Sequence, residues 1–325
     1  MIPREWFESA LERIALHIVR TPLTHDPARG VFLKWENRQV TGSFKARGAL
    51  NKILVLEPWE RDAGLVAASA GNHGQGVALA AGLAGAKAEI FVPVHAVAAK
   101  VDAIRALGAE VHLVEGGYGA TEALAKAHAQ EAGRTFISPY NDGQVIAGQG
   151  TVALEAARQL KEEHGTDARE IVTWIVPASG GGLICGCAAA LTGNGPRPRM
   201  IGVQPSASPF TYNLFHHGTQ EGARDDPTLA DGLSGAIDPK SITIPMMREL
   251  VDDIVLVSEE SIERAIAFAW WTYSEKLEGS AAAALAAFLD GAAAEGPCVL
   301  VLTGGNIQGE VFEGILRRYP EPARS

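Results

Sequence analysis

The sequence predicts an α/β fold with two doubly wound domains, each built on a parallel sheet. Short apolar runs rich in β-branched residues alternate with alanine-rich runs of helical periodicity along the 325 residues. The apolar runs are nearly continuous, as expected for strands that helices cover on both faces of a parallel sheet. A chain of this length also favours two domains over one.

The expected elements alternate in order. Strands are predicted at 65–68, 89–92, 111–114, 171–176, 200–203, 254–257 and 299–302. Helices are predicted at 44–50, 75–86, 96–107, 121–131, 152–163 and 261–276. Residues 63–141 hold three strand–helix units, so we expect them to form a small domain, with 1–62 and 142–325 forming a large one. A ligand would then bind between the sheets, at the carboxyl ends of the strands.

Charge and composition exclude several classes of protein. The net charge of -10 and the lack of a basic stripe argue against a nucleic-acid partner. Residues 1–16 are acidic and amphipathic, unlike a signal peptide, and the apolar segment 280–289 is too short to span a membrane. The three cysteines, Cys185, Cys187 and Cys298, indicate reduced, packed thiols and a cytoplasmic protein, and we assign no metal ligands.

Lys45 is the candidate nucleophile. We expect it in the first turn of a helix for which Ser43 is the N-cap. The helix dipole, the nearby charge of Arg47 and burial beside Phe44 would all lower the pKa of the Lys45 amine. The neutral amine attacks carbonyl groups, as a Schiff-base lysine must. Taken alone, however, a lysine in such a position is most often an ordinary solvated side chain.

The first glycine-rich loop follows the apolar strand predicted at 171–176. Successive backbone amides at the start of a helix form a cup for an anion. The loop lacks the spacing of a dinucleotide or P-loop motif, and the next strand ends at Gln204 rather than at an acid. A single phosphomonoester therefore fits better than a nucleotide. The cup consists of Ser179, Gly180, Gly181, Gly182 and Leu183.

Two further loops follow predicted strands. Residues 69–76 end on a helix start, whose amides could hold a carboxylate together with the side chain of Asn72. His73 suggests a general base, but without a visible partner we favour a role in packing the helix start. At 303–306, Thr303 is followed by two glycines, which let a flat ligand approach the backbone closely. This arrangement suggests a hydrogen bond between the Thr303 hydroxyl and the ring of the ligand.

Taken together, these motifs resemble the fold-type II pyridoxal phosphate enzymes, specifically the serine/threonine dehydratase (threonine ammonia-lyase) and serine racemase group. The resemblance runs from the Arg-Thr-Pro-Leu segment at 20–23, through 34–45, to 303–306. It implies pyridoxal 5′-phosphate as cofactor, bound by the large domain, a small domain that closes over the substrate, and a homodimer. The implied reaction removes water from a small β-hydroxy amino acid, L-threonine or L-serine, giving a 2-oxo acid and ammonia.

The resemblance also implies a role for each motif. Lys45 would carry the cofactor, next to Phe44, and would move the Cα proton. Asn72 would bond the 3′-oxygen, and Thr303 would face the pyridine nitrogen, where a hydroxyl leaves the ring a weaker electron sink and favours elimination. Glu278 resembles an acid near the cofactor, without an assigned step. The phosphate would be held by 179–183, and the substrate carboxylate by Ser69, Ala70, Gly71, Asn72 and His73.

The chain departs from the family pattern in two places that bear on activity. Ala70 stands where serine racemases have the serine that protonates the opposite face of Cα, so we expect poor racemisation. At the family's divalent-cation site, carboxylates are replaced by Gln204 and Phe210, with Ser208 as the third residue, so we expect no activation by Mg²⁺ or Ca²⁺. Hydroxyaspartate dehydration and a racemase-like activity remain alternatives, and a non-catalytic nucleotide-binding protein is a distant one.

Overall fold

The larger of two sheets has six strands in the order β1-β2-β10-β7-β8-β9. The computed structural model of the chain describes residues 2–193, 197–293 and 296–321. Every neighbouring pair in this sheet is parallel except the β1–β2 hairpin. Its strands are β1 (Leu23–Asp26), β2 (Val31–Trp35), β10 (Cys298–Leu302), β7 (Thr173–Pro177), β8 (Arg199–Pro205) and β9 (Asp253–Val257).

The smaller sheet is entirely parallel, in the order β5-β4-β3-β6. Its strands are β5 (Glu110–Val114), β4 (Ala88–Pro93), β3 (Leu65–Ala68) and β6 (Thr135–Phe136). The predicted α/β class with parallel sheets is thus confirmed, and each of the strands predicted from the sequence is present. The sequence did not indicate β1, β2 or β6, which are either partly polar or too short to form an apolar run.

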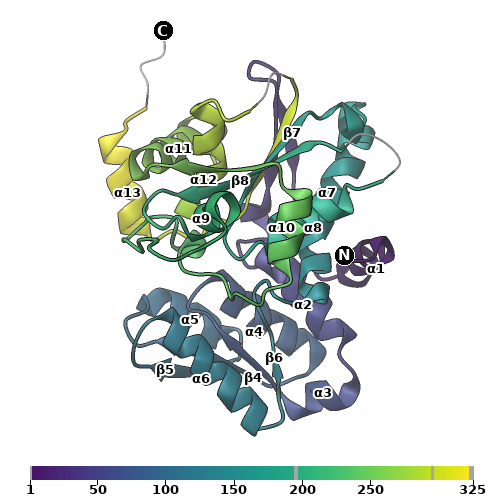
Figure 1. Cartoon of the computed structure of the whole chain (residues 1–325), viewed down its shortest axis with the longest axis vertical. Helices are drawn as coiled ribbons and strands as arrows, with labels where there is room; N and C mark the ends of the chain where they lie inside the picture. Colours follow the sequence, from purple (N-terminus) through teal and green to yellow (C-terminus); the bar gives the residue numbers. More distant parts are fainter. Residues whose placement is uncertain (1, 194–196, 294–295, 322–325) are drawn as a thin grey trace.

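Helices surround both sheets (Figure 1). Near the smaller sheet lie α2 (Lys45–Val55), α3 (Pro58–Ala63), α4 (Asn72–Ala84), α5 (Ala98–Ala106) and α6 (Tyr118–Glu131). Near the larger sheet lie α1 (Arg4–Ile14), α7 (Gly143–His164), α8 (Gly182–Ala190), α9 (Phe210–His217), α10 (Thr243–Leu250), α11 (Glu259–Tyr273), α12 (Gly279–Leu289) and α13 (Gly309–Arg318). Helix α7 begins nine residues before its predicted start, because the Asp142 side chain caps it by accepting from the amides of Gln144 and Val145.

The strands of the larger sheet are buried on both faces. Trp174 and Val299 pack with α7 and α8, whereas their chain neighbours Ile175 and Leu300 pack with α11 and α12 on the opposite face. This arrangement explains the continuous apolar runs in the sequence, because successive side chains of a strand point to opposite faces. Free thiols of Cys185, Cys187 and Cys298 lie within these cores.

Helix α2 lies between the two layers. Its residues Ala46, Leu50 and Ile53 share a core with the smaller sheet, and the helix also packs against α7 of the larger one. The segment 1–62, which the sequence suggested for the large domain, therefore contributes apolar side chains to both cores. Within the described part of the chain, no helix combines the length and apolarity needed to cross a membrane.

Candidate active site

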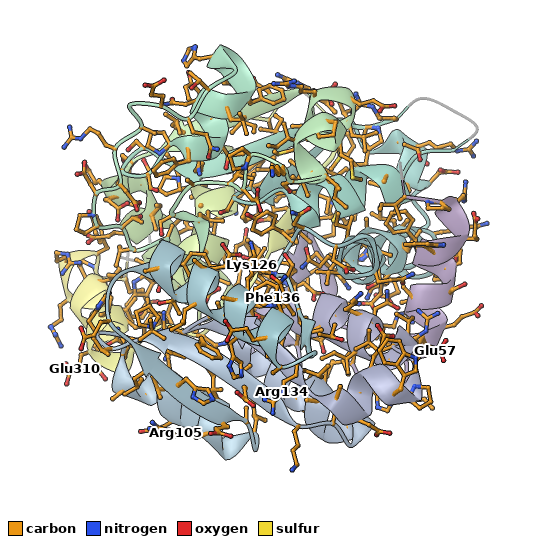
Figure 2. All side chains as sticks on the ribbon, turned by 60° about the horizontal axis from the view of Figure 1, so that its bottom comes forward. Glu57, Arg105, Lys126, Arg134, Phe136 and Glu310 are labelled. Carbon is orange, nitrogen blue, oxygen red and sulfur yellow. The ribbon has the colours of Figure 1, made fainter. Side chains whose placement is uncertain are left out.

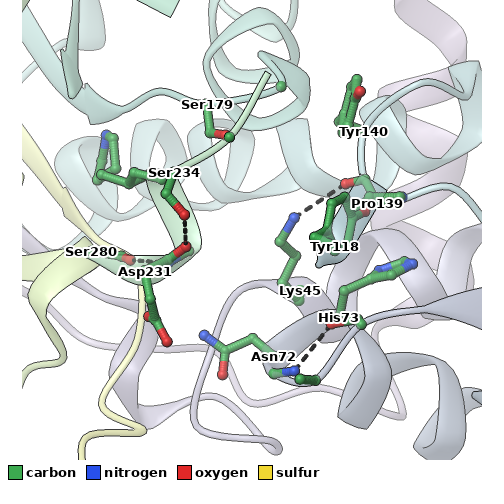
Figure 3. A pocket seen from close by; sticks show the side chains of 18 of the residues that line it. Lys45, Asn72, His73, Tyr118, Pro139, Tyr140, Ser179, Asp231, Ser234 and Ser280 are labelled. Atoms are coloured by element: carbon green, nitrogen blue, oxygen red, sulfur yellow. Dashed lines mark hydrogen bonds between the residues drawn. The ribbon is translucent and has the colours of Figure 1, made fainter. Parts of the chain in front are cut away.

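A cavity of about 390 Å³ opens where the carboxyl ends of β3, β4, β7 and β10 meet. Loops that are far apart in the sequence line it together (Figure 3). All the candidate site residues inferred from the sequence are among its lining residues. These are Phe44, Lys45, Ser69, Ala70, Gly71, Asn72, His73, Ser179, Gly180, Gly181, Gly182, Leu183 and Thr303, with Glu278 beside them.

Lys45 is the first residue of α2, and its side chain extends into the cavity (Figure 3). Its Nζ lies 3.2 Å from the carbonyl oxygen of Pro139 and 5.2 Å from the centre of the Phe44 ring. Burial lowers the pKa of the amine to about 8, and the negative charge of Glu278 acts in the opposite direction. A large fraction of this amine is therefore neutral near pH 8.

The predicted influence of Arg47 on this amine is wrong. The Arg47 guanidinium is fully buried and points away from the cavity into a bidentate ion pair with Glu36, with Nε and Nη2 each 2.8 Å from a carboxylate oxygen. Its Nη2 also bonds Glu155 at 2.8 Å. Because two carboxylates neutralise it, burial rather than charge repulsion lowers the pKa of Lys45.

The predicted N-cap is also wrong, because Phe44 holds the cap position and Ser43 caps nothing. Ser43 instead forms a bridge with Gly304, and the amide of Phe44 donates to the carbonyl of Thr303 at 3.1 Å. The amide of Gly305 donates to Gly42 at 2.9 Å in the same ladder. These bonds hold the segment 42–44, which precedes Lys45, against the segment 303–305. Lys45 and Thr303 therefore line the same cavity.

The glycine cup has its carbonyls turned away from the cavity. Thr211 Oγ1 donates to the carbonyl of Ser179 at 2.9 Å, and Thr243 Oγ1 donates to that of Gly180 at 2.7 Å. Among the described residues, no protein acceptor takes the amides of 180–183. Together with the start of α8, these amides form an anion site of the size of a phosphate.

Only glycine fits parts of this cup. A Cβ added at Gly180 would lie 2.3 Å from Cγ of Tyr140, whose ring covers the loop. Gly181 has a φ of +82°, a region that L-residues with side chains rarely adopt. Packing therefore requires glycine at 180, and backbone geometry favours it at 181.

Asn72 is held in one orientation by two partners. Its Nδ2 donates to Oε1 of Glu278 at 2.7 Å, and its Oδ1 accepts from Nδ2 of Asn306, also at 2.7 Å. Burial, followed by the charge of Asp231, raises the pKa of Glu278 to about 7. The second hydrogen of the Asn72 amide is left for a ligand in the cavity.

His73 lies in the cavity wall but its ring is already engaged. Its Nε2 bonds the carbonyl of Ile137 at 2.8 Å. Burial and the charge of Lys45 lower its pKa to about 3, so the ring is neutral at physiological pH. This geometry favours the packing role over the general-base role.

Several lining residues carry no sequence signal. Tyr140 accepts a hydrogen bond from the amide of Asp238 at 3.0 Å while its ring covers the cup, and Gln149 Nε2 holds the carbonyl of Pro139 at 3.1 Å. Lys100 Nζ of α5 contacts Asp231 at 2.5 Å and so joins α5 to the 3₁₀ turn Asp231–Leu233 on the other side of the cavity. No short motif could have identified them, since each acts through a partner remote in the sequence.

A buried amine, an anion cup and an oriented amide are the groups that pyridoxal phosphate needs for its aldehyde, its phosphate and its ring oxygen. The model of the family described as "Pyridoxal-phosphate dependent enzyme" matches residues 14–304. The chain belongs to this family. Pyridoxal 5′-phosphate is accordingly its cofactor, and the protein is an enzyme of the dehydratase group that the sequence motifs resemble.

Curated relatives agree with this membership. The chain is 39% identical to "L-threonine ammonia-lyase" of Thermotoga maritima, over 89% of this chain and 70% of that protein. It is 40% identical to "L-threonine dehydratase catabolic TdcB" of Escherichia coli K12, over 85% of this chain and 83% of that protein.

Solved structures are similar over nearly the whole chain. Maize serine racemase matches with a TM-score of 0.87 and 31% identity, covering 97% of each chain. The processed form of threonine deaminase isoform 2 from Solanum lycopersicum matches with a TM-score of 0.85 and 29% identity, covering 96% of this chain and 87% of that one.

The sequence predicts that this chain lacks the family's divalent-cation site, and the structure shows the side-chain amide of Gln204 at that position hydrogen-bonded within the protein. Gln204 Nε2 bonds Thr211 Oγ1 and the carbonyl of Leu233, each at 3.2 Å, while its Oε1 accepts from the amide of Tyr212 at 3.0 Å. The side chain is fully buried and its donors and acceptor are engaged. Insensitivity to Mg²⁺ and Ca²⁺ stays a prediction.

Proposed function

We propose that this enzyme is an ammonia-lyase that removes water from L-threonine or L-serine and yields a 2-oxo acid and ammonia. The observation that carries the proposal is the meeting of a buried amine of lowered pKa, Lys45, with the glycine cup and the oriented Asn72 in one cavity. The threonine ammonia-lyase and threonine dehydratase relatives support this substrate class.

Bound pyridoxal phosphate supplies an aldehyde for the substrate amine and an electron sink for the Cα–H bond. Lys45 would hold the cofactor in the resting enzyme, and its Nζ, once free, would accept the Cα proton. The cup 179–183 would hold the phosphate, and the free amide hydrogen of Asn72 would orient the ring. Thr303 would offer the ring nitrogen a hydroxyl rather than a carboxylate, which would favour loss of the β-hydroxyl.

The substrate carboxylate would bind at 69–73, where β3 ends and α4 begins. The amide of Gly71 donates to the Ser69 hydroxyl at 3.1 Å, which shapes the loop, and α4 starts at Asn72 with its positive dipole end toward the cavity. Because Lys45 lines the same cavity, a substrate bound at this point would have its Cα within reach of Nζ.

The cavity favours a substrate with one carboxylate. Lysines among its described lining residues are Lys45 and Lys100, and no arginine lines it. Lys100 is engaged by Asp231 at 2.5 Å. A second carboxylate, as in hydroxyaspartate, would lack the planar donor pair that binds such groups well.

A racemase-like activity is the second candidate, because the fold is closely similar to that of maize serine racemase. Racemisation needs a proton donor on the face of Cα opposite Lys45. Ala70, which lines the cavity, has no such proton. We expect elimination to dominate, and Ala70→Ser to raise the rate at which D-serine forms from L-serine while wild type forms little.

We further propose that residues 63–141 act as a small domain that closes over the substrate, with the Lys100–Asp231 pair as a contact across the mouth. We also propose that the enzyme is a cytoplasmic homodimer, as the family resemblance implies. Small-angle scattering with and without substrate, and sedimentation analysis, would test the closure and the dimer.

The central test compares wild type, Lys45→Ala and Lys161→Ala, the last removing an exposed lysine from α7. Each is assayed with L-threonine, L-serine and hydroxyaspartate for 2-oxo acid and ammonia, and treated with borohydride to trap the cofactor. Wild type and Lys161→Ala should turn over L-threonine or L-serine and yield a pyridoxyl adduct on Lys45. Turnover by Lys45→Ala, or an adduct on another side chain, would refute the assignment.

A further inference from the structure

Four side chains of types that can ligate metal ions, Glu89, Glu110, His112 and His128, lie close together on the small sheet, away from the active-site cavity. In the register of the two strands, Glu89 of β4 lies beside Glu110 of β5, and Phe91 lies beside His112. Because residues two apart on a strand point to the same side, Glu89, Glu110 and His112 share one face of the sheet. Helix α6 covers that face and brings His128 to the same place. None of these residues lines the cavity.

The imidazoles of His112 and His128 both lie close to the same carboxylate oxygen, Oε2 of Glu89. His128 Nε2 lies 2.8 Å and His112 Nε2 lies 3.0 Å from Oε2 of Glu89. Glu110 Oε1 is 3.6 Å from His112 Nε2. The ligand atoms of Glu89, Glu110 and His112 all lie within 4.8 Å of one another, which is the span of a single coordination sphere.

The contact between His112 and Glu89 is close but misaligned. His112 Nε2 is buried, and although a carboxylate oxygen is 3.0 Å away, the nitrogen has no hydrogen-bond partner. A buried ring nitrogen without an aligned partner is costly, so an additional group is expected to satisfy it. A cation placed among the two nitrogens and the carboxylate oxygen would do so.

Spacing and surroundings suit zinc. Bonds of about 2.0–2.2 Å in a tetrahedral site place its ligand atoms roughly 3.4 Å apart, and His112 Nε2 lies 3.0 Å from Glu89 Oε2 and 3.6 Å from Glu110 Oε1. Phe91 stacks on His112 at 4.7 Å between ring centres and contacts His128 at 5.2 Å, which fixes both rings.

The second oxygen of Glu89 is held from outside the cluster. Arg134, which follows α6 and is labelled below Phe136 in Figure 2, pairs with Glu89 Oε1. Hydrogen-bonded partners of this kind orient carboxylate ligands in known metal sites. Two carboxylates and one guanidinium leave the cluster negative when both imidazoles are neutral, and that charge favours a cation.

We propose that Glu89, Glu110 and His112 bind one Zn²⁺ ion or a similar divalent transition ion, with Nε2 of His128, 2.8 Å from Glu89 Oε2, as a fourth ligand. The ion links β4, β5 and α6 and stabilises the small sheet. It takes no part in catalysis, so the site is independent of the proposed reaction. Residues at 89, 110, 112 and 128 show no recognisable ligand spacing, which is why sequence reasoning assigned no metal.

The test uses holoenzyme freed of metal by chelation and titrated with ZnSO₄ by calorimetry. Wild type should bind one equivalent, and His112→Ala and His128→Ala should each weaken that binding at least ~100-fold, since each removes one of the two imidazole ligands that suit zinc. The control is His217→Ala, which removes an exposed histidine from α9 and should bind as wild type does.

Two further measurements separate loss of the site from loss of the fold. Co²⁺ bound by wild type should give the visible absorption bands of a tetrahedral complex, absent in His112→Ala, while the lyase assay and circular dichroism of that variant stay unchanged. Zn²⁺ should also raise the unfolding midpoint of wild type and not of His112→Ala. If wild type binds no Zn²⁺ at micromolar concentrations, or if His112→Ala binds as well as wild type, the cluster is a hydrogen-bonded ion pair only and the proposal fails.

Discussion

Asn72 Nδ2 donates to Glu278 Oε1 across 2.7 Å, and this bond joins the first residue of α4 to the N-cap of α12. The two helices belong to different sheets, so one hydrogen bond couples the two halves of the active-site cavity. Because Asn306 holds the other end of the amide, Asn72 can present only its remaining hydrogen to the cofactor. Glu278 is thus a positioning residue.

Glu278→Ala should weaken binding of pyridoxal phosphate by about tenfold, because loss of a hydrogen bond to a charged group costs about 1.5 kcal/mol or more. Glu278→Gln keeps an acceptor oxygen for Asn72 and should stay within about threefold of wild type. Equilibrium dialysis of the cofactor against the apoenzyme measures both. Equal losses in the two variants would show that the charge of Glu278, rather than its acceptor, matters.

Capture of the cofactor should depend on pH through Lys45. The neutral amine is the nucleophile, and burial lowers its pKa to about 8, so the fraction of reactive amine rises with pH and is nearly complete above pH 9. Stopped-flow absorbance of apoenzyme mixed with pyridoxal phosphate should therefore give a rate that levels off above pH 9. A rate still rising steeply at pH 10 would mean that the amine titrates as an ordinary solvent-exposed lysine does.

Gly180→Ala should weaken cofactor binding at least ~10-fold, because the added Cβ would lie 2.3 Å from the Tyr140 ring and displace either the ring or the cup. The matched control is Gly119→Ala in α6, where a Cβ meets no atom within 4 Å. Fluorescence titration with the cofactor compares the variants. Wild-type affinity in Gly180→Ala would contradict the packing argument.

Arg47→Met should destabilise the protein by about 3–5 kcal/mol, because it leaves Glu36 buried without its cationic partner and leaves Glu155 with Lys34 alone. Arg169→Met, which removes an exposed ion pair with Asp167, should change the denaturation midpoint little. Urea titrations of both variants measure the difference. A similar small effect in the two variants would show that Arg47 does not hold the start of α2.

Mg²⁺ and Ca²⁺ should leave the activity unchanged, because the amide of Gln204 already occupies its hydrogen-bonding capacity with Thr211, Tyr212 and Leu233. Steady-state rates in EDTA and in millimolar MgCl₂ should agree. Replacing Gln204 with Glu supplies a carboxylate. Activation by Mg²⁺ in that variant alone would support the conclusion that Gln204 is the reason wild type does not respond to Mg²⁺. Activation of wild type by Mg²⁺ would refute it.

Motifs within short stretches were visible in the sequence because local chemistry specifies them. The glycine cup, the run around Lys45 and the strands that precede each loop could be recognised from adjacent residues. Ser43 shows the limit of this reasoning. A serine before a helix is a typical N-cap, yet here the pairing of its backbone with Gly304, 261 residues away, takes precedence over the local preference.

The sequence by itself determined the alternation of strands and helices, the family motifs and the candidate amine, since these depend on neighbouring residues and their periodicity. Only the tertiary structure decided which groups meet: the withdrawal of Arg47 toward Glu36, the bond between Asn72 and Glu278, and the two histidines on Glu89. Such contacts join residues on different elements, and burial and charge act over ångströms in space, whatever the distance along the chain.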